Sequence, residues 1–362
     1  MGKSLNVAVL FGGCSSEYSV SLQSAYSVIT HIDRQRYTPV LIGITANGQW
    51  FHYEGDVDKI PVNQWYDPRC CAPALLSPSR GDRALLVLRE DQVERISIDV
   101  AFPVLHGKNG EDGTVQGLIE LAGIPLAGCG TLSSALCMDK DRAHKLVALA
   151  GIAVPASAVL HRGASPEDAA AQADKLGYPL FVKPVRAGSS YGITKVSSPS
   201  QLPAAVELAF QHDSEVILEE AISGFEVGCA VLGNDVLTVG EPDEIELSGD
   251  FFDFTEKYTL KTSAIHVPAR ISPAARDAIR EAAQVIYRAL DCRGFARVDL
   301  FLDANGRLVF NEVNTIPGFT SHSRYPNMLK AVGMPFEQVV NTAIALALED
   351  GTGAARCVHG LS

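Results

Sequence analysis

A predicted hairpin in the last quarter of the sequence constrains the fold more than any other segment. Residues Phe295–Leu302 and Leu308–Phe310 are apolar and rich in strand-forming side chains, which predicts two β-strands. Between them lies Asn305-Gly306, the strongest short signal for a hairpin, because both central residues of a type I′ turn need positive φ angles. The sequence therefore predicts two antiparallel strands joined by a two-residue turn.

Polar residues interrupt this hairpin at facing positions. Counted back from a two-residue turn, the register pairs three sets of residues: Ala304 with Arg307, Asp299 with Glu312, and Arg297 with Asn314. Side chains two residues apart share one strand face, so the last two pairs form one polar group. Facing carboxylates repel each other unless a cation lies between them, and two carboxylates with an amide suit Mg²⁺. A surface strand end would explain the same residues without a ligand.

Composition argues against several functional classes. The 362 residues suffice for two or three domains, and the net charge of −12 argues against non-specific binding to nucleic acid. No apolar run approaches the length of a membrane-spanning helix. The eight cysteines form no CxxC pair, which indicates reduced, mostly buried thiols of a cytosolic protein and disfavours a zinc site.

The first 130 residues alternate strand and helix patterns, which predicts a parallel sheet with helices on its faces. The expected elements are strands at Asn6–Phe11, Tyr37–Ile44 and Ile98–Phe102 and helices at Val20–Ile32 and Thr114–Leu121. Two polar loops, residues 12–17 and 106–113, follow strands at the edge where such sheets bind ligands. Glu17 could bind a substrate ammonium or merely complement a helix dipole, and His106 could be functional or structural.

The middle of the chain contains a candidate phosphate loop. Lys183 ends an apolar strand pattern, and residues 186–192 (RAGSSYG) follow it. The length and serine content of this loop favour phosphate binding over a plain hairpin turn. Further along, Glu219 and Glu226 could hydrogen-bond a nucleobase amine and a ribose, although acids are also common at solvated strand ends.

Helix and strand patterns account for most of the remaining sequence. Helices are expected at Leu132–Ala150, Pro166–Leu176, Ala274–Leu290 and Phe336–Leu348, and strands at Val154–Leu160, Val216–Glu220 and Phe225–Leu232. Residues 247–262 lack clean periodicity and indicate a lid. Residues 350–362 indicate a frayed tail.

In combination, these motifs resemble those of the ATP-grasp enzymes. Four segments are similar, in the same order, to the D-alanine:D-alanine ligase family: GGCSSEYSVSLQSA, FPVLHGKNGEDGTVQG, SALCMDKDRAHK and NEVNTIPGFTSHSRYP. The similarity extends over residues 5–348. It implies an α/β fold class, with an N-terminal parallel-sheet domain followed by a two-lobed ATP-grasp fold of α+β type. The implied divisions are a substrate domain at 1–130, a central lobe at 131–220, a C-terminal lobe at 221–350 with the lid at 247–262, and a tail at 351–362.

The lid and the residues near position 324 refine this resemblance. Residues 250–258 and 323–326 look most similar to vancomycin-resistance D-alanine:D-serine ligases of the VanG type. Relatives that incorporate D-lactate have a histidine-bearing lid, whereas this chain has Lys257 and Tyr258, which disfavours an ester-forming ligase. The resemblance implies that ATP drives the joining of D-alanine to a second D-amino acid, D-serine in the first instance, through a D-alanyl phosphate. The product would enter peptidoglycan precursor synthesis, with vancomycin resistance as one role it could serve. A D-alanine:D-alanine ligase and a non-catalytic ATP-grasp nucleotide sensor stay open as alternatives.

The resemblance also implies a role for each candidate residue. The catalytic set comprises Glu17, Ser189, Tyr258, Arg297 and Gly318, and the amino-acid substrates are bound by His106, Phe252, Lys257, Ser323 and Arg324. ATP is bound by Lys140, Lys183, Gly188, Ser190, Glu219 and Glu226, and the metal by Asp299, Glu312 and Asn314. The implied cofactors are ATP and two Mg²⁺ ions, which Mn²⁺ could replace. The implied state is a cytoplasmic homodimer whose partners are D-alanine, D-serine and ATP, without nucleic acid or membrane.

Overall fold

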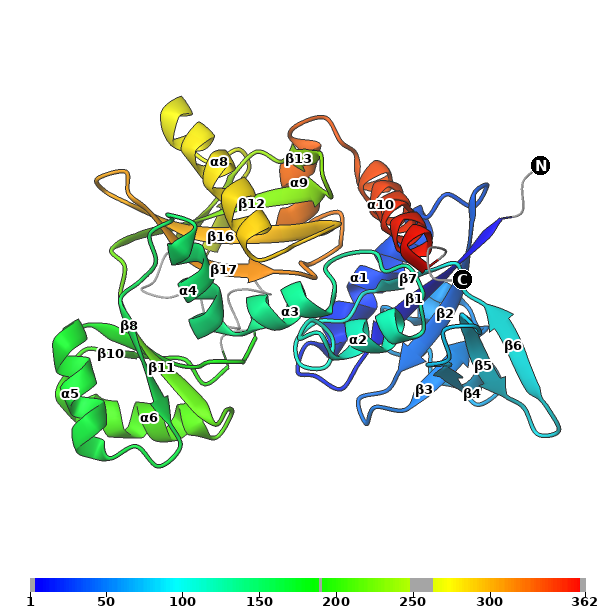
Figure 1. Cartoon of the computed structure of the whole chain (residues 1–362), viewed down its shortest axis with the longest axis horizontal. Helices are drawn as coiled ribbons and strands as arrows, with labels where there is room; N and C mark the ends of the chain where they lie inside the picture. Colours follow the sequence, from blue (N-terminus) through cyan, green and yellow to red (C-terminus); the bar gives the residue numbers. More distant parts are fainter. Residues whose placement is uncertain (1–3, 189–190, 248–262, 359–362) are drawn as a thin grey trace.

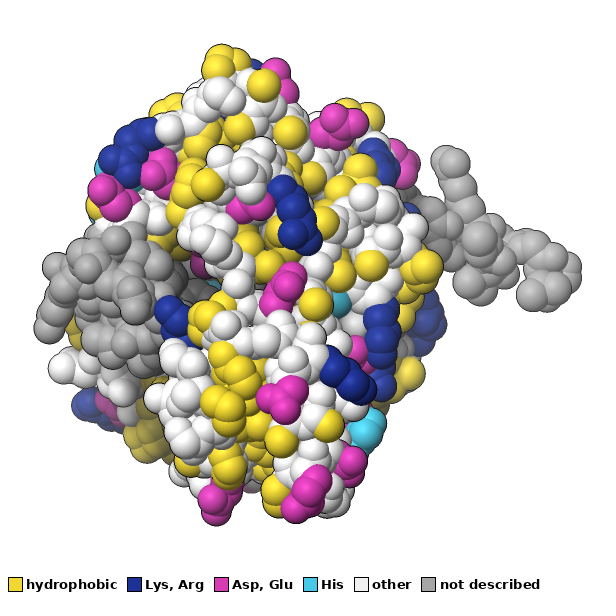
Figure 2. Space-filling model, turned by 90° about the vertical axis from the view of Figure 1, so that its left-hand side faces the viewer, with side chains coloured by type: hydrophobic (Ala, Val, Ile, Leu, Met, Phe, Trp, Pro, Cys, Tyr) yellow, Lys and Arg dark blue, Asp and Glu magenta, His cyan; other side chains and the backbone are white. Residues whose placement is uncertain are grey.

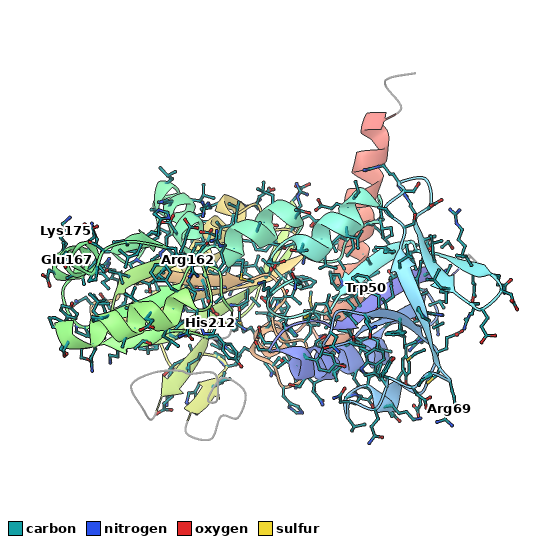
Figure 3. All side chains as sticks on the ribbon, turned by 90° about the horizontal axis from the view of Figure 1, so that it is seen from below. Trp50, Arg69, Arg162, Glu167, Lys175 and His212 are labelled. Atoms are coloured by element: carbon teal, nitrogen blue, oxygen red, sulfur yellow. The ribbon has the colours of Figure 1, made fainter. Side chains whose placement is uncertain are left out.

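The computed structural model describes residues 4–188, 191–247 and 263–358 of the chain. These residues form three β-sheets in three regions, which we call, in chain order, the N-terminal domain, the central lobe and the C-terminal lobe (Figure 1). Seen from below, Trp50 and Arg69 lie toward one end of the molecule, while Glu167 and Lys175 lie at the other (Figure 3). The N-terminal domain and the central lobe therefore lie at opposite ends of the molecule.

The N-terminal domain is built on a mixed sheet with the strand order β6-β5-β4-β3-β2-β1-β7. Its strands are β1 (Leu5–Gly12), β2 (Tyr37–Ile44), β3 (Trp50–Tyr53), β4 (Cys71–Leu76), β5 (Ala84–Leu88), β6 (Val93–Ser97) and β7 (Val100–Pro103), with a short 3₁₀ helix at Val57–Lys59. Strand β1 runs parallel to both β2 and β7, which confirms the predicted parallel strands. The remaining neighbours pair antiparallel, so the sheet is mixed where a parallel sheet was expected.

Strand β1 is apolar along its length because both of its faces are buried. Val7, Val9 and Phe11 pack in one core with helix α1 (Tyr18–His31), while the alternate residues of β1 pack in another core with helix α2 (Thr114–Leu121). A strand covered on both faces reads as a continuous apolar run rather than an alternating one. Because β1 and β7 are parallel, the loops that follow them leave the sheet at the same edge.

The prediction of one helix over Leu132–Ala150 is wrong, because the chain breaks at Asp139. The observed helices are α3 (Thr131–Met138) and α4 (Lys140–Leu149). Asp139 is extended, with φ −91° and ψ 101°, and its carboxylate accepts a hydrogen bond of 3.0 Å from the Arg142 backbone N–H. This is the N-cap arrangement that starts a helix. Lys140 consequently becomes the first residue of a new helix.

The central lobe packs a small antiparallel sheet against two helices through one apolar core. Its elements are β8 (Ser157–His161), α5 (Pro166–Leu176), β9 (Leu180–Pro184), β10 (Thr194–Val196), a 3₁₀ helix (Pro199–Gln201), α6 (Leu202–Phe210) and β11 (Glu215–Glu220), with the strand order β10-β9-β11-β8. Hydrophobic side chains gather on the lower part of this end of the molecule (Figure 2). Pairing of β9 with β11 brings Lys183 next to Glu219.

The C-terminal lobe contains the third sheet, with the strand order β15-β14-β12-β16-β17 and β13 paired to β12. Its elements are β12 (Gly224–Gly233), β13 (Leu237–Val239), β14 (Asp243–Leu247), β15 (Ser263–His266), α8 (Pro273–Ala289), β16 (Phe295–Asp303), β17 (Leu308–Asn314), α9 (Arg324–Lys330) and α10 (Phe336–Val358). Helix α10 continues beyond its predicted end at Leu348. In the described part of the chain, no helix is long and apolar enough to cross a bilayer.

The hairpin of β16 and β17 forms around a three-residue turn, so the predicted two-residue turn is wrong. The Asp303 N–H donates to the Arg307 carbonyl at 3.1 Å, and Gly306 adopts a φ of +81°. This is the three-residue hairpin in which the last turn residue is left-handed. Beyond the turn Leu302 faces Leu308, one residue away from the register that a two-residue turn would give.

A bulge in β17 restores the predicted register where the polar residues lie. Leu300 pairs with Phe310 but Asp299 pairs with Glu312, so Asn311 is an extra residue in β17. The longer turn and the bulge shift the register by one residue each, in opposite senses. The predicted facing pairs are confirmed: Asp299 with Glu312 and Arg297 with Asn314.

Aromatic rings join the N-terminal domain to the C-terminal lobe. The ring centroids of Phe102 in β7 and Phe295 in β16 lie 5.8 Å apart, and Phe319 lies 5.8 Å from the first and 5.0 Å from the second. Tyr325 of α9 stacks on Phe319 with 5.6 Å between centroids. Buried aromatic clusters of this kind contribute large apolar areas. The two regions therefore share one core, which fixes the loop between β17 and α9.

The left-handed turn residue gives a test of the hairpin. A Cβ on Gly306 meets no atom within 4 Å, so Gly306→Ala adds only the backbone strain of an L residue at φ +81°. We expect the free energy of unfolding to fall by about 1 to 2 kcal/mol in a urea titration. Gly81→Ala is the matched control, because it has equal space and no positive φ. Equal stability of the two variants would contradict the three-residue turn.

Candidate active site

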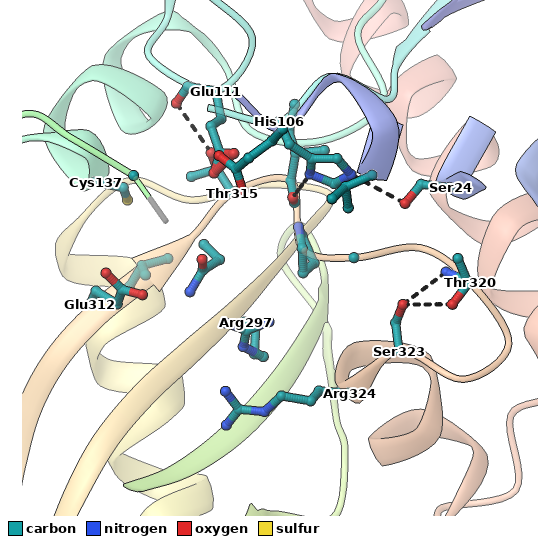
Figure 4. Close-up of a pocket in the computed structure, with 18 of the residues that line it drawn as sticks. Ser24, His106, Glu111, Cys137, Arg297, Glu312, Thr315, Thr320, Ser323 and Arg324 are labelled. Atoms are coloured by element: carbon teal, nitrogen blue, oxygen red, sulfur yellow. Dashed lines mark hydrogen bonds between the residues drawn. The ribbon is translucent and has the colours of Figure 1, made fainter. Parts of the chain in front are cut away.

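A pocket of about 480 Å³ lies where the three regions meet (Figure 4). Ten of the predicted site residues line it: Glu17 and His106 from the N-terminal domain, Lys140 and Gly188 from the central part of the chain, and Arg297, Glu312, Asn314, Gly318, Ser323 and Arg324 from the C-terminal lobe. Predicted residues that do not line it are Lys183, Glu219, Glu226 and Asp299. The residues Ser189, Ser190, Phe252, Lys257 and Tyr258 lie outside the described part of the chain.

Glu17 lies between two glycine-containing loops. It occupies the N-cap position of α1, but its side chain makes no capping hydrogen bond, and the residue is 7% exposed. A Cβ on Gly107 would lie 2.7 Å from the Glu17 Oε2 atom, and a Cβ on Gly188 would lie 3.4 Å from it. The carboxylate therefore lies at the pocket instead of capping its own helix.

His106 is buried and both of its ring nitrogens are engaged. The Nδ1 atom lies 2.9 Å from the Ile316 carbonyl oxygen, and the Nε2 atom lies 3.2 Å from the Ser24 Oγ atom (Figure 4). A carbonyl only accepts, so Nδ1 carries the proton and Nε2 accepts from the Ser24 hydroxyl. Ser24 in turn accepts a hydrogen bond of 3.2 Å from the Phe319 N–H. His106 thus holds the loop after β17 against α1.

Arg297 is fixed by the carboxylate two residues along the same strand. Its Nε atom lies 2.8 Å from Asp299 Oδ1, and its NH2 atom lies 2.7 Å from Oδ2. Asn314 donates to the same Oδ2 atom at 2.9 Å. Burial works against the charge on Arg297, but the adjacent Asp299 carboxylate outweighs it and raises the pKa of the guanidinium. A buried cation with a rigid orientation therefore lines the pocket.

Arg324 is the centre of a second buried network. Its Nε and NH2 atoms contact Asp243 at 2.6 and 2.8 Å, and its NH1 atom lies 2.9 Å from Glu226 Oε1. Burial opposes the charge, yet Asp243 above all raises the pKa of Arg324 well above its usual value. A Cβ on Gly228 would lie 2.5 Å from the Arg324 NH2 atom, so only glycine leaves room for this arrangement.

The sequence analysis missed Asp243, and also Ser24 and Glu111, which line or support the pocket. Asp243 is fully buried at the start of β14, although its surroundings in the sequence, EPDEIEL, look like a solvated segment. The position of Asp243 gave a weak signal for a functional role, because this residue begins a strand that directly precedes the predicted lid in the sequence. Its partner Arg324 is 81 residues away, and no local pattern connects them.

The central lobe contributes two lysines and a buried acid. Lys140 Nζ donates to the Ala187 carbonyl at 2.8 Å, while Lys183 donates to Glu219 Oε1 and lies 5.4 Å from the Phe181 ring centroid. Glu219 Oε2 is buried without a hydrogen-bond partner among the described residues. A buried carboxylate oxygen in this state fits a polar ligand that donates a hydrogen bond, such as the amine of a nucleobase.

The predicted metal residues come together, with a difference in their roles. Both Asp299 oxygens accept from Arg297 or Asn314, whereas Glu312 lines the pocket. The described residues contain no group of three or more His, Cys, Asp or Glu side chains arranged for a metal ion. Mg²⁺ is commonly held by only one or two carboxylates together with waters and substrate phosphates. The residues present fit a divalent ion of that kind, with Glu312 as its most accessible carboxylate.

Comparison with known proteins identifies relatives of this arrangement. The family model described as "D-ala D-ala ligase N-terminus" matches residues 6–129, and the model "D-ala D-ala ligase C-terminus" matches residues 146–345. The crystal structure of the VanG D-Ala:D-Ser ligase from Enterococcus faecalis is 57% identical, with a TM-score of 0.90, and covers 95% of this chain and 100% of that chain.

Two further relatives extend this comparison. The vancomycin B-type resistance protein VanB of Enterococcus faecalis is 48% identical over 350 residues, which cover 95% of this chain and 99% of VanB. The structure of the D-alanine-D-alanine ligase from Coxiella burnetii is 30% identical, with a TM-score of 0.87, and covers 99% of this chain and 98% of that chain. The similarity therefore includes the N-terminal domain and both lobes.

The buried pair of Arg297 and Asp299 beside the pocket gives a second test. Asp299→Asn leaves the Arg297 charge buried beside a neutral amide, so we expect the free energy of unfolding to fall by about 3 to 5 kcal/mol, measured by urea denaturation without ligands. Asp277→Asn is the control, because its side chain is 67% exposed and pairs only at the surface. A loss below about 1 kcal/mol for Asp299→Asn would argue against a structural role of the pair.

Proposed function

The chain belongs to the D-alanine:D-alanine ligase family, and we propose that it uses ATP to join D-alanine to D-serine for peptidoglycan precursors. The observation that carries the proposal is the pocket itself, where a carboxylate for an ammonium, cations for phosphates and carboxylates, and a buried arginine clamp converge. The identity to the VanG D-Ala:D-Ser ligase supports D-serine as second substrate. Vancomycin resistance is the role that such a product would serve.

The first D-alanine binds through its ammonium to Glu17. This carboxylate is buried between the two glycine loops, where an opposite charge is favoured. Because His106 uses both ring nitrogens to hold the loop after β17, it positions this subsite rather than transferring a proton. Ser189 and Tyr258 complete the link from Glu17 to the lid, as the family resemblance implies.

The reaction activates the D-alanine carboxylate before the second amine attacks. A free carboxylate is a poor acyl donor, so the γ-phosphoryl group of ATP is transferred to it to give D-alanyl phosphate. The amine of the second amino acid then attacks the carbonyl carbon, and phosphate leaves. Arg297 and the Gly318 N–H stabilise the oxyanion that forms in this step. Arg297 is preorganised for this role, because Asp299 fixes its guanidinium before any substrate binds.

ATP is held between the two lobes. Lys140 and Lys183 bind its phosphates, the loop containing Gly188 and Ser190 covers them, and Glu219 accepts from the adenine amine through its unpaired oxygen. Glu226, whose Oε1 atom accepts a hydrogen bond from Arg324, binds the ribose. Asp299, Glu312 and Asn314 would hold Mg²⁺, or Mn²⁺ in its place, and the ion would supply charge neutralisation for the phosphates.

Arg324 reads the side chain of the second amino acid. By the family resemblance, Lys257 and Ser323 bind the carboxylate of this substrate, and Phe252 acts with Arg324 in shaping the pocket that reads its side chain. Asp243 holds the guanidinium at two points, so the donor is rigid where a D-serine hydroxyl would accept. The methyl group of D-alanine in the same place would leave the Arg324 guanidinium without this acceptor, which costs about 1 to 3 kcal/mol.

Cellular location and assembly belong to the same proposal. ATP and amino-acid substrates place the reaction in the cytoplasm, and a homodimer is the assembly that the family resemblance implies. Sedimentation of the full chain would test the second point, because a monomer at micromolar concentration would contradict it. The domain divisions at residues 130 and 220 likewise remain part of the proposal.

Competition between amino acids tests the function. With ATP, Mg²⁺, D-alanine and an equal concentration of D-serine, we expect D-alanyl-D-serine to exceed D-alanyl-D-alanine by about tenfold or more, measured by mass spectrometry. Phosphate release should need both ATP and D-alanine. Dominant D-alanyl-D-alanine would instead assign a D-alanine:D-alanine ligase, and no phosphate release with any amino acid would leave a nucleotide sensor.

The Arg324 assignment has its own variant in this assay. Lysine keeps the charge but cannot make the two-point contact with Asp243, so Arg324→Lys should lower the D-serine preference by about tenfold. Arg276→Lys, at an exposed ion pair, is the control and should keep the preference. Unchanged selectivity in Arg324→Lys would show that another group reads the hydroxyl.

A further inference from the structure

His144 contacts the bulge of β17 from outside the sheet. It lies on α4, four residues after Lys140, and is 4% exposed. Its ring packs edge-on against Phe310, with 5.6 Å between centroids and an interplanar angle of 80°. Its Nε2 atom lies 3.3 Å from the Asn311 carbonyl oxygen. One imidazole therefore contacts the two consecutive residues at which the register changes.

The protonation state of this histidine follows from its surroundings. Burial lowers the pKa of His144, the charge of Glu219 opposes this effect, and Lys183 adds to it, so the ring is neutral. A neutral imidazole has one N–H, and the carbonyl of Asn311 can only accept, so the proton lies on Nε2. The Nδ1 atom is buried without a hydrogen-bond partner among the described residues. The hydrogen bond to Asn311 therefore orients the ring, together with Glu219 Oε2, which lies 3.9 Å from the same Nε2 atom.

The bulge decides which side chains reach the pocket. The three-residue turn alone would continue the pairing of Leu300 with Phe310 into a pairing of Asp299 with Asn311. A register slip of one residue turns every following side chain to the other face of the strand. Glu312 and Asn314 would then leave the face that carries Arg297 and Asp299, and Val313 would replace them. Arg297, Asp299, Glu312 and Asn314 share one face of the hairpin only while Asn311 remains the extra residue of the bulge.

Among the described residues, no strand pairs with the outer edge of β17, and residues of α4 and of the segment between α4 and β8 contact this edge instead. In the sheet order β17 is the last strand, beyond β16. The Phe310 N–H donates to the Ala153 carbonyl at 2.8 Å, and the Asn311 carbonyl faces His144 Nε2 at 3.3 Å. A bulge residue otherwise loses its ladder hydrogen bond, so these contacts make the irregular backbone stable.

We propose that His144 is a positioning residue for Glu312, because its Nε2–H bond to the Asn311 carbonyl keeps the bulge that presents Glu312 and Asn314 to the pocket. The inference rests on the proposed function only in taking these two residues as metal ligands. His144 touches neither substrate nor metal. Its hydrogen bond acts on the metal side through the backbone of one residue. Its Nε2 atom also lies 3.9 Å from Glu219 Oε2, and Lys140 begins the same helix, so the nucleotide side and the metal side share one support.

The test compares two amides of different length at this position in the full-length protein. His144→Gln places an N–H where Nε2 lies and should keep Mn²⁺ binding, measured by electron paramagnetic resonance with ADP present, within about threefold of wild type. His144→Asn is one methylene shorter and cannot reach Asn311, so Mn²⁺ binding should weaken about tenfold or more. His144→Leu should behave as His144→Asn does.

A second readout does not depend on the metal. Amide hydrogen exchange of residues 309–314, measured without ligands, should accelerate in His144→Asn and His144→Leu and stay near wild type in His144→Gln. Val147→Ala is the packing control, because Val147 is fully buried on the same helix and has no hydrogen bond to the bulge. Val147→Ala should lower the free energy of unfolding. Exchange in residues 309–314 should not accelerate beyond what this global loss of stability explains, and Mn²⁺ binding should not weaken.

The outcomes separate this proposal from the ligase function. Equal Mn²⁺ affinity and equal local exchange in the Gln and Asn variants would overturn the role of His144, whatever the enzyme makes. A wild-type protein that binds Mn²⁺ with ADP but forms no dipeptide would overturn the ligase function. The difference in Mn²⁺ affinity and local exchange between the Gln and Asn variants would still test the role of His144. If His144→Leu does not fold, the comparison of the two amides decides alone.

Discussion

The register of one hairpin, β16 with β17, determines what the pocket contains. It puts the carboxylates of Asp299 and Glu312 opposite each other on a buried sheet. At about 5 Å and an effective dielectric constant of about 20, two such charges repel by roughly 3 kcal/mol. Arg297 offsets this cost, since its guanidinium holds both oxygens of Asp299. A divalent ion at Glu312 would offset it further, which explains why a folded chain tolerates this arrangement at a binding site.

The second buried network shows how the same lobe separates two tasks. Arg297 is held by an acid on its own strand, whereas Arg324 is held by Asp243 from a different strand, next to the lid. A Cβ on Gly228 would lie within 2.9 Å of Arg324 NH2, Asp243 Oδ1 and Asp299 Oδ1, so glycine at this position leaves space for Arg324 and for both acids. In the proposed reaction, the first arginine is the oxyanion donor and the second reads the side chain of the incoming amino acid. The two networks also touch, because the Arg324 NH2 atom lies 3.4 Å from Asp299 Oδ1, so a change at Arg324 can affect both substrate choice and the support of Arg297.

The sequence alone predicted correctly which polar residues face each other in the hairpin, but the turn assumed for that prediction was one residue too short and the bulge was not foreseen. Local turn preferences indicated a two-residue turn and could not indicate a bulge, whose support comes from His144 far away in the sequence. Asp139 was read as part of one long helix because its capping role depends on a backbone break, not on periodicity. The antiparallel strands β3 to β6 were missed because they are short and partly exposed. Asp243 was missed because its partner is distant, and the resemblance to a known family supplied the roles that no local pattern could.

A crystal structure of the protein with Mn²⁺ and ADP tests the central claim most directly, because manganese is visible by its anomalous signal. The account predicts a peak about 2.1 Å from a Glu312 carboxylate oxygen, on the face of β17 that also carries Asn314, with the bulge at Asn311 intact. A peak elsewhere, with Glu312 turned away from the nucleotide phosphates, would contradict it.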